Sequence, residues 1–129
     1  MNVWVEAARP RTLPAAVVPV IVGTAAAVAV GAPIDLDRAM LALLVALALQ
    51  VAVNYANDLF DGLAGVDTPD RLGPRRVVAA RLVTPRAMRT ALFVALVVAA
   101  SAGAVLAFMV DPWFLLLGAA AIAAALGYS

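Results

Sequence analysis

Near its middle the chain reads Gln50-Val51-Ala52-Val53-Asn54-Tyr55-Ala56-Asn57-Asp58-Leu59-Phe60-Asp61, directly after ten apolar residues at 40–49. A continuous apolar run of this kind predicts a helix at membrane depth. At about 100° per residue, four of the polar residues fall within about 60° of one another, and the fifth borders them. We call this face the polar stripe; its members are Gln50, Asn54, Asn57, Asp58 and Asp61. Such side chains are costly in a membrane unless they meet a cation, water or a ligand, so the stripe predicts a site.

The composition excludes an ordinary soluble domain. Of the 129 residues, 66% are hydrophobic and only 13% are charged, and the mean hydropathy is +1.04. Because a helix needs about 20 residues to cross the hydrocarbon core, the uncharged stretches at 12–34, 39–57, 91–110 and 112–129 are each candidate spans. The runs are continuous rather than alternating, which argues against a membrane barrel. We therefore expect an all-α, polytopic transmembrane bundle with four helices in this chain.

The expected helices occupy about 12–33, 38–61, 85–110 and 112–129, and together form the N-terminal part of a membrane domain. Thr12 is a plausible N-cap for the first helix, and Asp35 or Asp37 for the second. Thr84 followed by Pro85 is typical of the start of the third. Between the second and third helices, residues 62–76 hold three Gly and two Pro, which predicts a loop over about 62–84.

The arginines alternate along the chain. They precede the first helix and crowd the 62–84 loop and the start of the third helix, whereas the other two connections are acidic and hold a single Arg38. The positive-inside rule therefore places the N-terminus and the long loop in the cytoplasm, with the chain a multi-pass protein of the inner (plasma) membrane. Since topology explains the arginines, we expect no nucleic-acid partner. The chain has no Cys and no His, so any metal would be a hard cation held by oxygen.

The two stripe carboxylates, Asp58 and Asp61, stand three residues apart, which makes them neighbours on a helix face. They repel each other unless a cation neutralises them. Mg²⁺ suits such a place, because it keeps waters and accepts one or two carboxylates together with substrate phosphate oxygens. Arg71, Arg75 and Arg76 follow in the loop and could grip a phosphate. These residues imply a metal–diphosphate bound where the bilayer meets water.

Other interpretations stay open at this point. Taken singly, the acids could be solvated residues where the helix leaves the membrane, Asn54 could bond a neighbouring helix, and each arginine could be a topology anchor. Asp67 and Asp70 are as compatible with a turn as with a ligand role. As a whole, the chain could also be a small cation-coupled transporter or a membrane scaffold. A transporter should carry acids near the bilayer midplane, whereas the acids of the polar stripe lie at one end of the expected helix.

The motifs resemble one family. Asn54-x-x-Asn57-Asp58-x-x-Asp61, followed by Asp67-Thr68-x-Asp70-Arg71-x-Gly73-Pro74 and Arg75 or Arg76, is similar to the first aspartate-rich motif of the UbiA superfamily of intramembrane prenyltransferases. The entry Arg9-Pro10-Arg11-Thr12-Leu13-Pro14-Ala15, with Pro19 and Gly23 beyond, resembles its 1,4-dihydroxy-2-naphthoate polyprenyltransferase branch. These segments cover about a third of the chain, and the third and fourth helices match only in hydropathy.

The resemblance implies a fold of about nine helices, of which this chain holds about half, around a cavity with two aspartate-rich motifs. It further implies that Mg²⁺ is held by Asn57, Asp58 and Asp61, the two acids being catalytic. The diphosphate of a polyprenyl diphosphate would be held by Asn54, Asn57, Asp67, Arg71, Arg75 and Arg76. The polyprenyl group would pass to 1,4-dihydroxy-2-naphthoate and give demethylmenaquinone; another aromatic acceptor is the alternative.

Two departures from the family pattern are visible. Gly65 stands where ubiquinone-type members have a further Asp, which favours the naphthoate branch. The second aspartate-rich motif is absent, because nothing after Asp111 is acidic. We therefore expect that the C-terminal half of the enzyme is missing from this chain, and that the chain alone is inactive.

Overall fold

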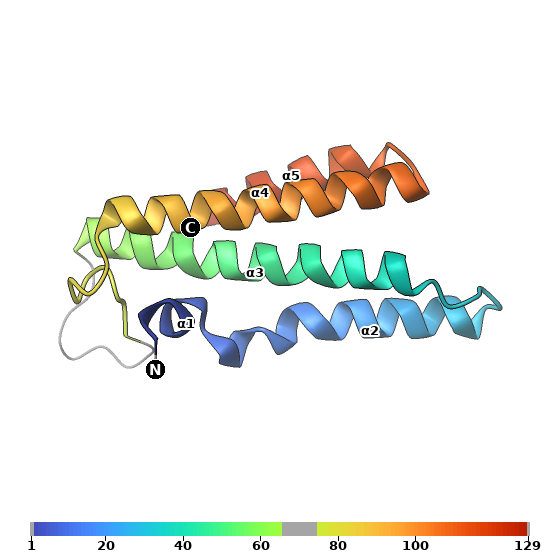
Figure 1. Ribbon diagram of the computed structural model, residues 1–129, viewed down its shortest axis with the longest axis horizontal. Helices are drawn as coiled ribbons and strands as arrows, with labels where there is room; N and C mark the ends of the chain where they lie inside the picture. Colours follow the sequence, from blue (N-terminus) through green and yellow to red (C-terminus); the bar gives the residue numbers. More distant parts are fainter. Residues whose placement is uncertain (1, 66–74, 129) are drawn as a thin grey trace.

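The computed structural model describes residues 2–65 and 75–128, and this part of the chain consists of helices joined by turns, without strands. Its elements are α1 (Val3–Ala8), the 3-10 turn η1 (Pro10–Thr12), α2 (Pro14–Ala29), α3 (Leu36–Ala64), α4 (Pro85–Val110) and α5 (Phe114–Tyr128). The prediction of an all-α membrane bundle is confirmed. Figure 1 shows an elongated bundle in which α3 lies between α2 and α4, while α5 turns back along α4. The most extensive contact joins α3 and α4.

Two of the expected helix starts are confirmed by their caps. Before α3, the Asp35 carboxylate accepts a hydrogen bond of 3.0 Å from the Arg38 N–H. Before α4, the Thr84 hydroxyl accepts one of 3.2 Å from the Ala87 N–H. Each bond satisfies an amide that the first turn of a helix leaves without a helical partner. The helix α3 ends at Gly65, whose φ of 64° lies in the left-handed region that glycine adopts without a steric penalty.

The entry to the first span differs from expectation. Thr12 is not the N-cap of α2; Leu13 occupies that position and makes no side-chain cap. The chain instead turns at Arg9, whose φ is 52°, and passes through η1. Pro10 and Pro14 each lack an N–H and hold φ near −65°, which favours two short helical starts over one continuous helix. As a result, Val3–Thr12 and Pro14–Ala29 meet at an angle of 47°.

The chain is a membrane protein by the length and composition of its helices. Within the described residues, α3 and α4 are each long and apolar enough to cross a membrane, and the bent pair of α1–η1 with α2 makes a third candidate span. The fourth expected span corresponds to α5, which has 15 residues. At 1.5 Å per residue this helix is about 22 Å long, short of a hydrocarbon core of about 30 Å.

The core of the molecule lies at the end where α1, the end of α3 and the start of α4 meet. It also includes part of the segment at residues 75–84, which we call the return segment because it leads back to α4. The buried members of this cluster are Ala7, Ala52, Ala56, Leu59, Val77, Val78, Val83, Met88 and Leu92. Farther along, the buried side chains of α4 are alanines, and α5 has no buried residue. The best-buried part of the fold therefore surrounds the polar stripe.

Candidate functional site

The polar stripe occupies the second half of α3 and divides into two edges. Asn54 and Asp58, at 3% and 0% exposure, form its buried edge. Gln50, Asn57 and Asp61 are half-buried and form its open edge. Helical geometry explains the split, because the open-edge residues lie within about 40° of one another, and the buried-edge residues are rotated from them toward α1 and α4. The two edges have different partners.

On the buried edge, Asn54 joins α3 to the start of the chain. Its side-chain amide donates a hydrogen bond of 2.8 Å to the Ala8 carbonyl and one of 2.9 Å to the Thr12 hydroxyl. That hydroxyl in turn donates to the Arg9 carbonyl at 2.9 Å. The Ala8 carbonyl stands at the end of α1, where a helix leaves acceptors unsatisfied. Asn54 therefore holds the Arg9–Thr12 turn against α3.

Asp58 joins α3 to the return segment. Its Oδ2 accepts a hydrogen bond of 3.0 Å from the Val77 N–H, and its Oδ1 accepts one of 2.9 Å from the Val78 N–H. All of these groups are buried. A carboxylate in an apolar core requires such partners, and hydrogen bonds to a charged group contribute about 1.5–3 kcal/mol each. Asp58 is thus satisfied by backbone amides from a segment 19 and 20 residues farther along the chain.

Asp61 lies one turn beyond Asn57 on the open edge and forms an ion pair with Arg76. The side chains differ in exposure, at 33% for Asp61 and 7% for Arg76. The carboxylate therefore remains accessible to solvent, while the side chain of Arg76 is buried. This contact brings together two residues that the sequence assigned to one diphosphate site.

Gly62 makes this packing possible. A Cβ built on Gly62 would lie 2.7 Å from Val78 Cγ1 and 3.2 Å from the Ala79 backbone nitrogen. Any larger residue would push the return segment away from α3. From the sequence, Gly62 is expected only to be a loop residue. The feature that could have indicated its role is its position one helical turn after Asp58, where a missing side chain allows a close backbone approach.

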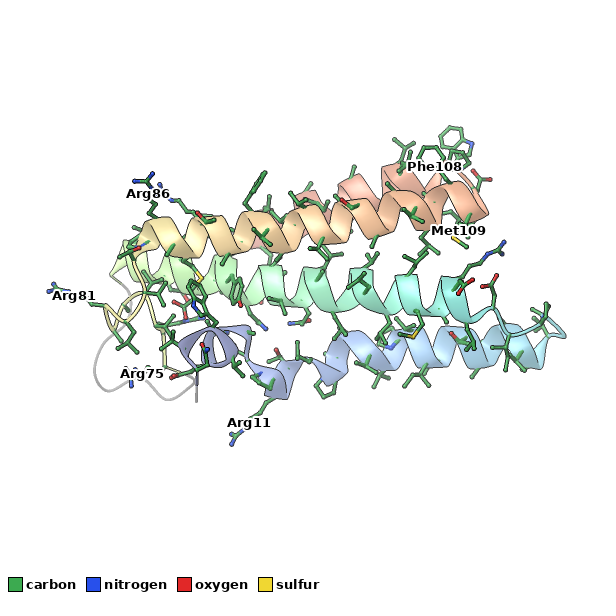
Figure 2. The ribbon with its side chains drawn as sticks, in the orientation of Figure 1. Arg11, Arg75, Arg81, Arg86, Phe108 and Met109 are labelled. Atoms are coloured by element: carbon green, nitrogen blue, oxygen red, sulfur yellow. The ribbon has the colours of Figure 1, made fainter. Side chains whose placement is uncertain are left out.

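Most of the described arginines lie at this end of the bundle. Figure 2 shows Arg11, Arg75, Arg81 and Arg86 projecting outward around the return segment and the N-terminal elements. Arg75 is exposed and directly precedes the ion-paired Arg76. Asp67 and Arg71, the two remaining predicted ligands, lie outside the described residues. The structure therefore places Arg76 against the stripe, while Arg75, next to it in the chain, projects outward from the return segment.

The described residues contain no group of three or more carboxylate, His or Cys side chains that could hold a metal. Asn57 and Asp61 nevertheless offer an amide and a carboxylate oxygen on one partly exposed helix face, four residues apart. That donor set fits Mg²⁺, which is bound by one or two carboxylates and completes its shell with water and phosphate oxygens. Asp58 was predicted to be a third ligand; both of its oxygens accept backbone hydrogen bonds, and its role as a ligand stays a prediction.

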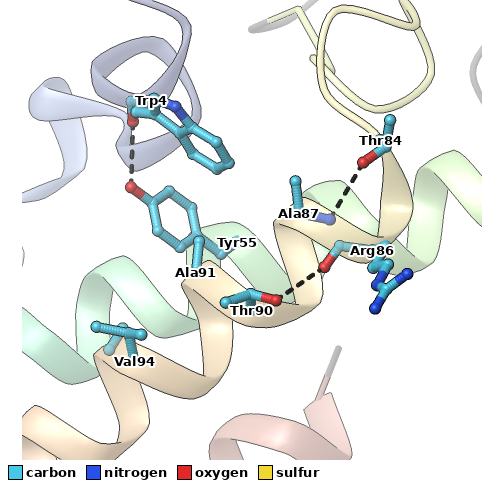
Figure 3. Close-up of a pocket in the computed structure, with 9 residues that line it drawn as sticks. Trp4, Tyr55, Thr84, Arg86, Ala87, Thr90, Ala91 and Val94 are labelled. Atoms are coloured by element: carbon cyan, nitrogen blue, oxygen red, sulfur yellow. Dashed lines mark hydrogen bonds between the residues drawn. The ribbon is translucent and has the colours of Figure 1, made fainter.

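A separate cavity of about 710 Å³ opens between α1, α3 and α4. Figure 3 shows Trp4 and Tyr55 on one side of it and the first turns of α4, from Thr84 to Val94, on the other. The Tyr55 hydroxyl donates to the Trp4 carbonyl at 3.3 Å, and the two rings pack edge to face with centroids 6.2 Å apart. No member of the polar stripe is among the described lining residues.

The family of the chain is identified by its similarity to known proteins. The UbiA prenyltransferase family matches residues 16–129. This chain belongs to the UbiA prenyltransferase family. It is 50% identical over 126 residues to a 1,4-dihydroxy-2-naphthoate octaprenyltransferase from Mycobacterium tuberculosis, and 47% identical to one from Mycobacterium leprae. A protein of the same name from Escherichia coli is 39% identical.

Each of these three alignments covers 98% of this chain and 42% of the relative. The chain therefore spans well under half the length of the curated relatives that it matches. No solved structure gives a significant match. The family resemblance inferred from the stripe and the Arg9–Ala15 entry is confirmed.

Proposed function

We propose that this chain supplies the diphosphate-binding helix of an Mg²⁺-dependent enzyme that transfers a polyprenyl group to 1,4-dihydroxy-2-naphthoate. The observation that carries the proposal is the open edge of α3, where the partly exposed Asp61 contacts the buried Arg76. An acid open to solvent and a guanidinium held beside it match the two halves of a metal–diphosphate, since the acid attracts the metal and the guanidinium the phosphate oxygens. The relatives, all named octaprenyltransferases for this acceptor, support the reaction.

Each residue then has a defined task. Asn57 and Asp61 offer oxygen ligands to Mg²⁺, which neutralises the leaving diphosphate when bound. Arg76 and Arg75, with the predicted Asp67 and Arg71, hold the phosphate oxygens. Asn54 and Asp58 lie behind this face and join it to the neighbouring backbone. Because α3 is apolar before the stripe, we expect the site at the membrane boundary, where an insoluble prenyl chain would lie in lipid while its diphosphate meets water.

The proposed chemistry is an electrophilic substitution. The bond between the allylic carbon and the diphosphate oxygen breaks, and the departing diphosphate takes the electron pair. The ring carbon that carries the carboxylate attacks the allylic cation, and the carboxyl group leaves as CO₂ while its electron pair restores the aromatic ring. The product is the quinol form of demethylmenaquinone. Fixed charges that face the developing diphosphate lower the barrier because they need no reorganisation during the reaction.

We further propose that the protein lies in the inner (plasma) membrane with the arginine-rich end in the cytoplasm. The described arginines support this orientation, because Arg38 alone among them lies at the opposite end, paired with Asp35. Cysteine accessibility labelling tests this orientation. Single cysteines are introduced at Arg81 and at Ala32, and intact cells are treated with a membrane-impermeant maleimide. Labelling of the Arg81→Cys protein before lysis, with none at Ala32→Cys, would contradict the orientation.

The function is tested in a chimaera in which this chain replaces the matched segment of the Mycobacterium tuberculosis relative, reconstituted in lipid nanodiscs. With Mg²⁺ and octaprenyl diphosphate, we expect prenylation of 1,4-dihydroxy-2-naphthoate and not of 4-hydroxybenzoate. Asp61→Asn should reduce kcat/KM by about 100-fold or more, because the acid is placed against the metal and diphosphate. Full activity of Asp61→Asn, or equal use of both acceptors, would contradict the proposal.

A further inference from the structure

We propose that Asp58 is a positioning residue, whose carboxylate fixes the Val77–Val78 backbone and thereby sets where Arg76 stands beside the open edge of α3. This inference rests on the proposed function, and it changes the role of one acid of the motif. The residues of the motif Asn57-Asp58-x-x-Asp61 then have two different roles. Asn57 and Asp61 face the ligand, and Asp58 fixes the return segment, whose Arg76 binds the ligand.

The hydrogen bonds of Asp58 supply the first argument. Each carboxylate oxygen accepts one backbone N–H, at 3.0 Å and 2.9 Å, from consecutive residues. This arrangement resembles a helix N-cap supplied by another element, since the amides of Val77 and Val78 begin a turn. In that turn the Ala80 N–H donates to the Arg76 carbonyl at 3.0 Å, and the Leu82 N–H to the Val77 carbonyl at 2.9 Å. The Asp58 side chain therefore caps the turn that begins at Val77 and Val78.

Burial supplies the second argument. Asp58 and Val77 are 0% exposed, and Val78 is 6% exposed. A fully buried carboxylate that accepts hydrogen bonds from the Val77 and Val78 amides is poorly placed to bind a metal or substrate that enters from water. Asp61, three residues along, has one third of its side chain exposed. The two acids thus differ in access, although the sequence presents them as a pair.

Gly62 supplies the third, independent argument. The return segment approaches α3 so closely at Gly62 that a single Cβ would lie 2.7 Å from Val78 Cγ1. Together Asp58, Arg76 and Gly62 fix the return segment by backbone hydrogen bonds, an ion pair and shape. The position of Arg76 relative to Asp61 is therefore set over about one turn of α3, from Asp58 to Gly62.

The test separates positioning from metal ligation. In the chimaera, Asp58→Asn keeps one acceptor but sets an amide NH₂ against a backbone N–H. We expect hydrogen exchange at the Val77 and Val78 amides to rise about tenfold or more, with a similar rise in KM for octaprenyl diphosphate. The Mg²⁺ concentration for half-maximal activity, at saturating diphosphate, should stay within about threefold of wild type. A large shift in that Mg²⁺ concentration with unchanged exchange would make Asp58 a ligand and overturn the inference.

Gly62→Ala provides the second variant, because it displaces the return segment without touching a carboxylate. It should reproduce both the faster exchange and the raised KM. Gly103→Ala is its matched control in α4, since the added Cβ meets only Val45 Cγ2, at 3.8 Å, and both readouts should stay at wild-type values. Faster exchange in Gly62→Ala with a normal KM would overturn the positioning role alone. A wild-type chimaera that forms no prenylated product would overturn the proposed function and the positioning role together.

Discussion

The two ends of the bundle are held together by different forces. At the arginine-rich end, side chains of α3 bond the backbone of segments distant in sequence: Asn54 bonds the Ala8 carbonyl, and Asp58 bonds the Val77 and Val78 amides. At the opposite end, the exposed Arg38–Asp35 pair, at 3.0 Å, joins residues only three positions apart in the sequence. There α4 buries alanines, among them Ala99, Ala102 and Ala107. Polar bonds fix the first end, whereas small side chains bring the helices together at the second.

This difference shows which end of the bundle has the more precisely determined structure. In a membrane, an apolar side chain gains little free energy by exchanging lipid for a neighbouring helix, because both are apolar. Helices therefore associate through close packing and polar bonds. Alanine packing tolerates small slides of one helix along another, while a buried carboxylate with two backbone donors fixes one position. The end that carries the proposed site is therefore the end whose geometry is most tightly determined.

The largest expected effect is at Asp58. Asp58→Ala leaves two buried amides without an acceptor, so we expect the free energy of unfolding to fall by about 3 kcal/mol or more. Titration with SDS in micelles of a mild detergent measures this loss of unfolding free energy. Asp37→Ala, at the exposed start of α3, is the matched control and should cost less than about 1 kcal/mol. Similar losses in both variants would remove the contrast between the two ends.

The packing of the second end is tested by Ala99→Leu. Ala99 is 2% exposed and belongs to the buried face of α4, so three further carbons would force the helices apart at a cost of about 1–3 kcal/mol. Ala100→Leu, on the exposed face of the same helix, should be nearly neutral. The same SDS titration compares them. An Ala99→Leu protein as stable as wild type would show that close packing contributes little there.

The two edges of the stripe are compared by a matched pair of amide substitutions. Asn54→Ala removes hydrogen bonds of 2.8 Å and 2.9 Å to the Ala8 carbonyl and the Thr12 hydroxyl, and should cost about 1–2 kcal/mol. Asn57→Ala, on the open edge, should change stability by less than about 0.5 kcal/mol. Proteolysis near η1 should also become faster in the Asn54 variant alone. Equal destabilisation by both would mean that the edges do not differ.

The smallest effect is expected at Arg38. Its ion pair with Asp35 involves side chains that are 50% and 43% exposed, and exposed pairs contribute about 0–1 kcal/mol. Arg38→Gln should therefore lower stability by less than about 0.5 kcal/mol in 150 mM salt. A loss above about 1 kcal/mol in the SDS titration would show that the second end also depends on a polar contact.

Much of the fold could be predicted from the sequence because hydropathy sets it directly. The long apolar runs predicted α3 and α4, and Asp35 and Thr84 marked their starts correctly. Thr12 was misassigned as an N-cap, because no local pattern indicates which residue the distant Asn54 bonds; its partner is the Thr12 hydroxyl, 42 residues away. Likewise, spacing placed Asp58 and Asp61 on one face, but only the path of the return segment shows that one is buried and the other is open. Such tertiary contacts carry no local signal.

The central claim is that the open edge of α3 binds a metal–diphosphate through Asp61. Equilibrium binding of farnesyl diphosphate to the chimaera in nanodiscs, titrated with and without Mg²⁺, tests it most directly. We predict binding that requires Mg²⁺ and is at least about tenfold weaker in Asp61→Asn, while Arg38→Gln at the other end binds as wild type does. Mg²⁺-dependent binding of equal strength in wild type and Asp61→Asn would contradict the account.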